Sequence, residues 1–168
     1  MFAGLRHPPK RFADLTEREI LAVAISAEEE DSRIYMTFAE DLQERYPASA
    51  KVFEAMAEEE QGHRGRLLDV YQKRFGSHLP PIRREDVKGF LRRRPVWLTR
   101  NLPLDTIRKQ AATMEYEARR FYQCAAMQAT DVGIRKLLGD LAFAEKKHES
   151  MAETLSDKLL TPNVRKEE

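Results

Sequence analysis

Two short motifs, Glu60-x-x-His63 and Glu145-x-x-His148, place a carboxylate three residues before an imidazole. On a helix, residues three apart are neighbours on one face, so each pair can reach the same ligand. Each pair also interrupts a stripe of apolar residues with helical spacing, which marks the face that packs against other helices. One such pair alone would favour a hydrogen-bonded core histidine. Because buried carboxylates are normally paired or bound to metal, the two pairs together predict a metal site.

A glutamate and a tyrosine seven positions apart form a second repeated feature, as Glu28 with Tyr35 and as Glu115 with Tyr122. Glu28 and Glu115 are separated by 87 positions, and the histidines of the two Glu-x-x-His motifs by 85. The chain therefore reads as two copies of one helical hairpin. In each copy, a helix with Glu-x6-Tyr precedes a helix with Glu-x-x-His.

Packing the two hairpins together would bring four glutamates and two histidines to the middle of one bundle. Four adjacent carboxylates repel one another and take up protons unless cations lie among them. Two divalent metals would neutralise them, and mixed oxygen and imidazole ligation suits iron or manganese, with zinc as a further occupant. The predicted ligands are Glu28, Glu60, His63, Glu115, Glu145 and His148.

Tyr35 and Tyr122 are expected to donate hydrogen bonds to ligand carboxylates, the alternative being that they are ordinary core tyrosines. Most other members of the acidic runs 28–30 and 58–60 are expected to be solvated.

Composition favours one helical domain, because the 168 residues are 42% hydrophobic and 34% charged and include only 7 glycines. The net charge of +1 is too small to give an overall electrostatic attraction to nucleic acid. The single cysteine, Cys124, excludes an intrachain disulfide and is expected to be a small core residue. We expect neither a membrane span nor a secretory signal within these residues.

The expected organisation is an N-terminal arm at 1–15, a domain at 16–161 and a charged tail at 162–168. Helices are predicted over 16–45, 49–75, 105–129 and 132–160. The short link between the last two makes them antiparallel neighbours. The predicted fold is therefore an all-α, antiparallel four-helix bundle with a long crossover, 77–104, between its second and third helices.

Helix ends are predicted from capping residues. Thr16-x-x-Glu19 has the form of a capping box, with Asp14 as the other candidate, and Gly76 is expected to end the second helix. Asp105 and Asp131 are expected to cap the third and fourth helices. Gly62 and Gly65 lie inside the second helix, where each costs about 1 kcal/mol relative to alanine. Either they allow close helix approach near the site, or they are simply tolerated.

The crossover is long for a link within a compact domain, and it contains four prolines. It could run the full length of the bundle or reach into another subunit. We expect a homodimer, which could exchange hairpins between its chains, and the alternative is a closed monomeric bundle. A short helix at 85–93 and an apolar anchor at 96–98 are expected. The basic side chains of the segment indicate either a solvated surface or an anionic partner such as a membrane. They are Arg83, Arg84, Lys88, Arg92, Arg93, Arg94 and Arg100.

The ligand set resembles that of the ferritin-like superfamily, in its rubrerythrin-like branch. Four stretches are similar to the membrane-bound ferritin A family, in which an erythrin domain is fused to a vacuolar-iron-transporter-like membrane domain. They are AISAEEEDSRIY at 24–35, PIRREDVKGF at 81–90, RPVWL at 94–98 and LLGDLA at 137–142.

The resemblance implies a ferritin-like di-iron site that oxidises Fe(II) with O2 or hydrogen peroxide. It further implies iron detoxification and export by a membrane domain after the tail, at the cytoplasmic side of the bacterial inner membrane. Two departures limit the likeness. Ala118 stands where rubrerythrins often carry an additional glutamate, which puts metal switching in doubt. The sequence has no Cys-x-x-Cys pair and hence no rubredoxin electron-transfer domain.

Two functional hypotheses follow, with a metal-free helical scaffold as a third. In the first, the site is a di-iron oxidoreductase in which Glu60 and Glu145 bridge the metals. Glu28 and Glu115 are then terminal ligands, and each histidine holds one metal. In the second, the domain captures or senses iron and delivers it to the transporter without turnover.

Overall fold

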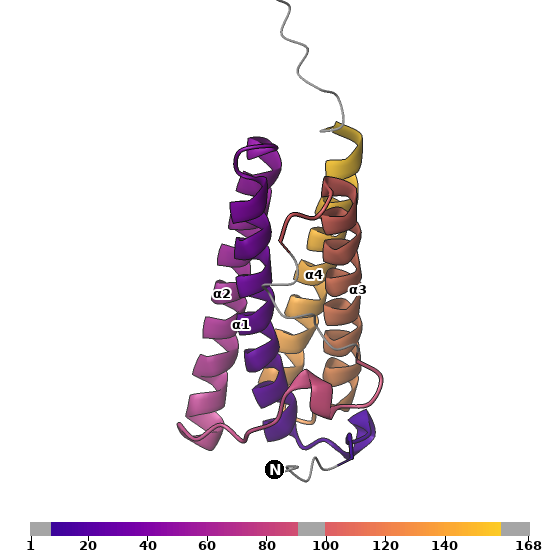
Figure 1. The fold of residues 1–168 in the computed structure, drawn as a ribbon. Helices are drawn as coiled ribbons and strands as arrows, with labels where there is room; N and C mark the ends of the chain where they lie inside the picture. Colours follow the sequence, from indigo (N-terminus) through magenta and orange to yellow (C-terminus); the bar gives the residue numbers. More distant parts are fainter. Residues whose placement is uncertain (1–7, 91–99, 159–168) are drawn as a thin grey trace, which may run out of the picture.

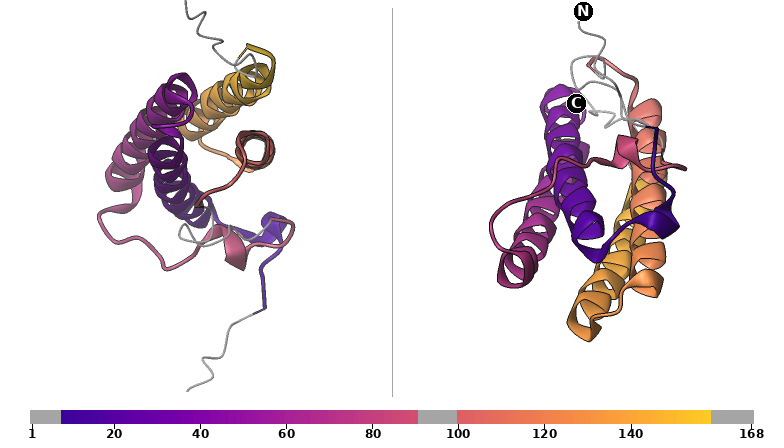
Figure 2. Two further views of the ribbon diagram at one scale, coloured as in Figure 1. Left: turned by 45° about the horizontal axis from the view of Figure 1, so that its top comes forward. Right: turned by 90° about the horizontal axis from the view of Figure 1, so that it is seen from below.

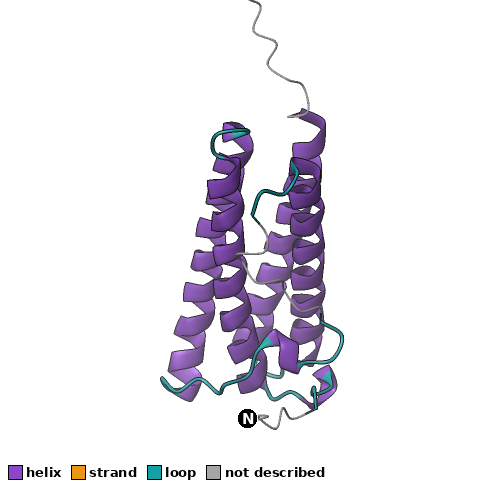
Figure 3. Cartoon of the chain, in the orientation of Figure 1, coloured by secondary structure: helices purple, strands orange, loops and turns teal. Residues whose placement is uncertain are grey.

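The computed structural model describes residues 8–90 and 100–158, and four long helices dominate these residues (Figure 1). They are α1 (Glu17–Leu42), α2 (Pro47–Phe75), α3 (Leu104–Gln128) and α4 (Val132–Lys158), with short 3-10 helices η1 (Phe12–Asp14) and η2 (Arg84–Asp86). No strand occurs in the described part of the chain (Figure 3). The predicted all-α four-helix bundle is confirmed.

Three of the predicted helix ends are confirmed. In the capping box, the backbone N–H of Glu19 donates to Thr16 Oγ1 at 3.1 Å, and Glu19 Oε1 accepts from the backbone N–H of Thr16 at 3.3 Å. Gly76 ends α2 with a positive φ of 80°, which glycine adopts without strain. Asp131 Oδ1 accepts from the backbone N–H of Ile134 at 2.9 Å, at the start of α4.

The prediction that Asp105 caps the third helix is wrong. The helix begins one residue earlier, at Leu104, and follows Pro103. Asp105 instead lies in the first turn and pairs with Arg108 at 2.8 Å and Lys109 at 2.9 Å. Arg108 and Lys109, one turn further along the helix, pair with the Asp105 carboxylate. It therefore does not accept hydrogen bonds from the backbone N–H groups at the start of the helix.

The helices pair as two hairpins, α1 with α2 and α3 with α4, with α1 also beside α3 and α2 beside α4. Figure 2 shows these two pairs with the top of the bundle tilted forward and, in the second view, from below. The helix α2 ends, and α3 begins, at opposite ends of the bundle (Figure 1). The crossover therefore spans the length of the bundle, as one of the two predicted alternatives requires.

Two apolar clusters divide the interior along the bundle axis. One cluster includes Ile20, Leu67, Phe121 and Leu138, and the other includes Phe38, Phe53, Ile107 and Ala152. On every helix, the side chains that are buried between these two clusters are polar. We call this band the polar layer, and its members are Glu28, Glu60, His63, Glu115, Glu145 and His148.

One basic residue of the crossover is buried, so the prediction of a solvated segment is wrong for Arg84. Its guanidinium donates to Asp31 Oδ1 at 2.8 Å and to Glu30 Oε2 at 3.1 Å, and it also reaches the backbone oxygen of Ala27 at 3.2 Å. Burial lowers the pKa of Arg84, but the Asp31 carboxylate outweighs it, so that pKa is raised. Arg84 thereby fixes the crossover to α1, one turn beyond Glu28.

The surroundings of the two glycines inside α2 decide between the two explanations given for them. A Cβ added at Gly62 or Gly65 would meet no neighbouring atom within 4 Å, so close helix approach is not the reason for either glycine.

Cys124 is exposed, and the prediction of a core cysteine is wrong. The buried face of α3 contains Phe121, Tyr122 and Ala125, and Cys124 lies off that face. The expected anchor at 96–98 lies outside the described residues, as do residues 91–93 of the expected helix at 85–93.

Substitution of Arg84 should reveal how much the buried ion pair matters. Arg84→Met leaves Asp31 buried without its cation, a loss that typically costs about 3–5 kcal/mol of unfolding free energy. Urea unfolding followed by circular dichroism measures the change.

Arg66→Met is the matched control, because the Arg66–Asp140 pair is exposed and 3.9 Å apart, and such pairs contribute at most about 1 kcal/mol. The double variant Asp31→Leu, Arg84→Met should recover much of the loss, since it removes both charges. An Arg84→Met variant as stable as Arg66→Met would contradict the assignment.

Candidate metal centre

All four helices supply side chains to the polar layer. Glu28 comes from α1, Glu115 from α3, and each of α2 and α4 gives one Glu-x-x-His pair. All six side chains are buried, with His63 the most accessible at 7%. The structure thus brings together every residue that the sequence nominated as a ligand, from four helices of one chain.

The six side chains form two overlapping groups, within each of which one ligand atom per residue lies within 4.8 Å of the others. We name them the His63 group and the His148 group. The His63 group contains Glu28, Glu60, His63 and Glu145, and the His148 group contains Glu60, Glu115, Glu145 and His148. Glu60 and Glu145 belong to both, which is the arrangement that two neighbouring metals sharing two carboxylates would need.

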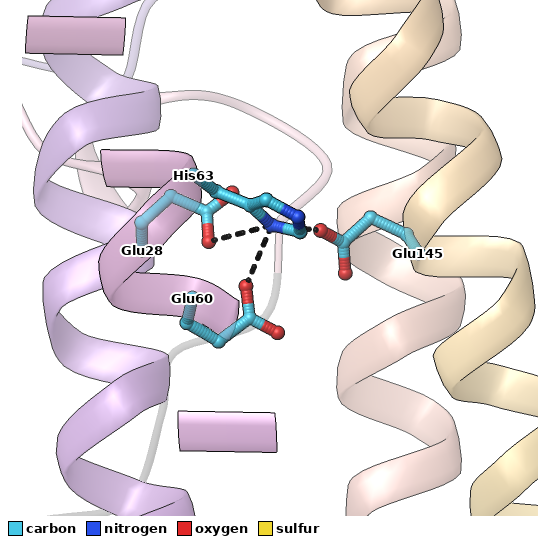
Figure 4. Close-up of side chains that lie close together, drawn as sticks. All are labelled: Glu28, Glu60, His63 and Glu145. Atoms are coloured by element: carbon cyan, nitrogen blue, oxygen red, sulfur yellow. Dashed lines mark hydrogen bonds and ion pairs between the residues drawn. The ribbon is translucent and has the colours of Figure 1, made fainter. Parts of the chain in front are cut away.

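In the His63 group, one nitrogen faces three carboxylates (Figure 4). His63 Nδ1 lies 3.2 Å from Glu60 Oε2, 3.2 Å from Glu145 Oε1 and 3.7 Å from Glu28 Oε2. Glu145 projects from α4 toward the α1–α2 hairpin, so this group bridges the two halves of the bundle.

The His148 group mirrors this geometry. His148 Nδ1 lies 3.2 Å from Glu60 Oε1, 3.4 Å from Glu115 Oε2 and 3.9 Å from Glu145 Oε2. The two imidazole rings are nearly parallel, with centroids 5.9 Å apart and planes 23° apart. The internal repeat of the sequence therefore appears as a near-symmetric pair of sites.

Tyr35 and Tyr122 cross between hairpins. The Tyr35 hydroxyl donates to Glu115 Oε1, and the Tyr122 hydroxyl donates to Glu28 Oε1. Since α1 and α3 run in opposite directions, each tyrosine lies level with the glutamate of the other helix. Burial, reinforced by those carboxylates, raises both phenol pKa values well above 10, so both hydroxyls stay protonated donors.

Several atoms of the layer are buried without a hydrogen-bond partner. They are Glu60 Oε1, Glu115 Oε2, Glu145 Oε1 and His148 Nδ1. His148 Nδ1 and Glu60 Oε1 are 3.2 Å apart, but their orientation is not that of a hydrogen bond. Buried polar atoms are nearly always satisfied, and all four of these could donate a lone pair to a cation. The donor set therefore fits two divalent metals with oxygen and nitrogen ligands.

The pKa values of the buried carboxyl groups also indicate that the layer is suited to bind cations. Burial, followed by the nearby Glu60 carboxylate, raises the pKa of Glu28 well above 4.5. Burial, followed by Glu115, does the same for Glu145, and burial also raises the pKa of Glu115. For Glu60, the nearby Glu28 carboxyl group and the two imidazoles outweigh burial and lower the pKa. Burial lowers the pKa of His148, but Glu115 and Glu60 outweigh it and raise that pKa to about 11.

Sequence reasoning missed Glu59 at this site. Its Oε2 lies 2.6 Å from His148 Nε2, although the acidic run at 58–60 was expected to be solvated beyond Glu60. Glu59 lies at the edge of the apolar stripe of α2 and is exposed, so periodicity gives no signal for it. The contact depends on how α2 lies against α4, which the local sequence does not encode.

A hollow adjoins the layer between α1, α3 and the crossover. Its lining includes Glu28, Tyr122, Arg84 and Phe90, together with Ala118. A glutamate in place of Ala118 would project into this space, so the alanine helps to keep it open.

Fold and site together define a ferritin-like bundle with a buried carboxylate–histidine cluster that could bind metal. The rubrerythrin family model matches residues 19–156, and the chain belongs to that family. No curated protein matches it.

Two solved structures share the fold. A hypothetical protein from Pyrococcus furiosus is 22% identical with a TM-score of 0.71, over 92% of this chain and 97% of that one. A putative ferritin-like diiron-carboxylate protein from Thermotoga maritima is 19% identical with a TM-score of 0.66, over 90% of this chain and 98% of that one.

Metal should stabilise the protein, and more strongly at higher pH. Glu28, Glu115 and Glu145 have folded pKa values above 4.5, so their stabilising protons are lost as the pH rises above that value. His148 acts in the same direction between 6.5 and about 11, whereas the contribution of Glu60 is already complete above 4.5. The metal-free protein should therefore be less stable at pH 8 than at pH 6.

Melting followed by circular dichroism, with EDTA or with Mn²⁺, measures this effect at both pH values. Each occupied site should add about 2.7 kcal/mol when free metal is 100 times Kd. Glu145→Gln should flatten the pH dependence of the metal-free protein, while Glu54→Gln, an exposed glutamate of α2, should leave it unchanged. Equal melting temperatures with EDTA and Mn²⁺ would rule out a metal-stabilised layer.

Proposed function

We propose that this domain is a non-haem di-iron carboxylate centre that binds two Fe(II) ions and oxidises them with O2 or hydrogen peroxide. The observation that carries the proposal is the pair of buried ligand groups that share Glu60 and Glu145. Membership of the rubrerythrin family and the fold shared with a putative diiron-carboxylate protein favour iron over manganese or zinc.

Each residue then has a definite role. Glu60 and Glu145 would be shared by the two ions, Glu28 and Glu115 would each bind one ion, and His63 and His148 would each bind one ion. Four carboxylates balance two divalent ions, which leaves the buried layer neutral. Tyr35 and Tyr122 hold the terminal carboxylates in place through their hydroxyl groups.

The reaction needs only a small oxidant. Hydrogen peroxide takes one electron from each Fe(II) together with two protons and leaves as two water molecules, whereas O2 takes the same electrons and protons and leaves as hydrogen peroxide. The hollow beside Glu28 and Tyr122 is the route we assign to this oxidant, because Ala118 keeps it open at the edge of the layer.

Iron oxidation in ligand variants tests the proposal. Protein loaded anaerobically with two Fe(II) per chain is mixed with O2 or hydrogen peroxide, and ferric absorbance is followed by stopped flow. His63→Ala and His148→Ala should each slow oxidation by more than the 10–100-fold that loss of an outer partner costs. Tyr35→Phe should cost less than either.

His78→Ala is the matched control, because His78 is exposed and lies outside the polar layer. Repeated turnover with excess Fe(II) supports an oxidase. A single stoichiometric event supports the alternative, a module that senses or delivers iron. Wild-type rates in His148→Ala would refute the site in either form.

We further propose that the domain serves a vacuolar-iron-transporter-like membrane domain attached after residues 162–168, in iron detoxification and export. The whole protein would then lie at the cytoplasmic side of the bacterial inner membrane. This proposal is supported by the sequence resemblance of the four stretches described above. Among the described helices, none combines the length and the apolar character that crossing a membrane requires.

We also propose a homodimer, whose chains could exchange hairpins in place of the closed bundle described above. Each hairpin carries half of the ligands, and the long crossover permits pairing within or between chains. Light scattering gives the mass. Co-refolding a chain lacking Glu60 and His63 with one lacking Glu145 and His148 should restore one intact site per exchanged dimer. Efficient refolding without recovered iron oxidation would support closed bundles instead.

A further inference from the structure

The two histidines of the polar layer have different outer partners. Both direct Nδ1 toward the carboxylates, at 3.2 Å from Glu60 in each case, so Nε2 of each ring points away from the centre. At His148, Nε2 meets Glu59 Oε2 at 2.6 Å. Among the described residues, His63 makes its hydrogen bond and ion pairs through Nδ1 alone.

This difference follows from one position at which the two copies of the internal repeat differ. Glu59 directly precedes Glu60 on α2, and the equivalent position before Glu145 on α4 is Ala144. A methyl group cannot accept a hydrogen bond, so the second copy of the hairpin has no counterpart to Glu59. The His148 group thus has an outer hydrogen-bond partner, Glu59, and the equivalent position of the repeat gives the His63 group none.

A carboxylate behind a histidine changes how that histidine binds a cation. By accepting a hydrogen bond from the Nε2–H group, it holds the proton on Nε2 and leaves the Nδ1 lone pair free for metal. It also fixes the rotation of the ring and raises its basicity. Glu59 is half exposed, with 53% of its side chain accessible, but His148 is only 2% accessible. The carboxylate therefore closes the outer side of the His148 group at the boundary of the buried layer.

We propose that Glu59 is a positioning residue that makes the two metal positions unequal, so that the His148 group fills before the His63 group. The proposal rests on the proposed function, in that both groups bind metal. It adds an order of loading that the shared ligands do not themselves impose, since Glu60 and Glu145 belong to both groups.

Calorimetric titration with Mn²⁺ tests the order, because it reports affinity without any oxidation. Wild-type protein should bind two ions in two distinguishable steps. Glu59→Gln should weaken the first step by about 10–100-fold, the usual cost of losing an outer partner of a metal-binding histidine. Glu58→Gln, an exposed acid next in sequence, should titrate like wild type and controls for the loss of one charge.

A double-mutant comparison separates positioning from a general structural effect. The Glu59→Gln effect should persist in a His63→Ala background and vanish in a His148→Ala background, since His148 is the one of the two histidines that contacts Glu59. Ala144→Glu should bring the two affinities closer together by giving His63 a matching partner. Circular dichroism of each metal-free variant checks that the bundle is folded.

Two indistinguishable steps in wild-type protein, or a Glu59→Gln effect that survives the loss of His148, would overturn the proposal. Either result leaves metal binding intact and therefore leaves the proposed function standing. Failure of folded wild-type protein to bind Mn²⁺ or Fe(II) at all would instead defeat the proposed function, and the loading order with it.

Discussion

Four buried carboxylates in one layer are the constraint on which the rest of this structure depends. Two apolar clusters enclose the layer, so water does not screen the charges of its side chains. Two imidazoles and two tyrosine hydroxyls compensate part of it, yet three of the four carboxyl groups still have raised pKa values. A bundle that only needed stability would fill these positions with leucine, because well-packed apolar residues are often as stable as buried charges. The polar layer thus indicates a selected function.

The seven-residue spacing between glutamate and tyrosine links the site to the chain path. Reciprocal pairing of Tyr35 with Glu115 and Tyr122 with Glu28 requires α1 and α3 to be antiparallel. Because α2 and α4 reverse direction within each hairpin, α2 and α3 are then parallel. Parallel helices of this length need a connection of roughly 40 Å, at about 1.5 Å of helix rise per residue. The long crossover is therefore a geometric requirement of the site, and Arg84 fastens it beside Glu28.

The helices and the six clustered residues could be predicted because their signals are local. Glu-x-x-His within an apolar stripe needs only a helix to become meaningful, and the repeat distance shows which glutamates correspond. Arg84 and Glu59 could not be predicted, since their partners, Asp31 and His148, are distant in sequence and their positions in basic or acidic runs suggest solvent. The small, apolar side chain of Cys124 favours the core, but the buried face of its helix contains Phe121, Tyr122 and Ala125 and leaves Cys124 exposed.

The division of the interior into two apolar clusters has a consequence for cooperativity. Each cluster contains segments of all four helices, and the charged layer between them is the weakest part of the interior without cations. Native-state hydrogen exchange would then report two cooperative units that open with separate free energies, in the manner of foldons. Cations held by ligands from all four helices join these units across the layer. Loading would therefore merge two opening events into one, in addition to raising the temperature at which the bundle melts.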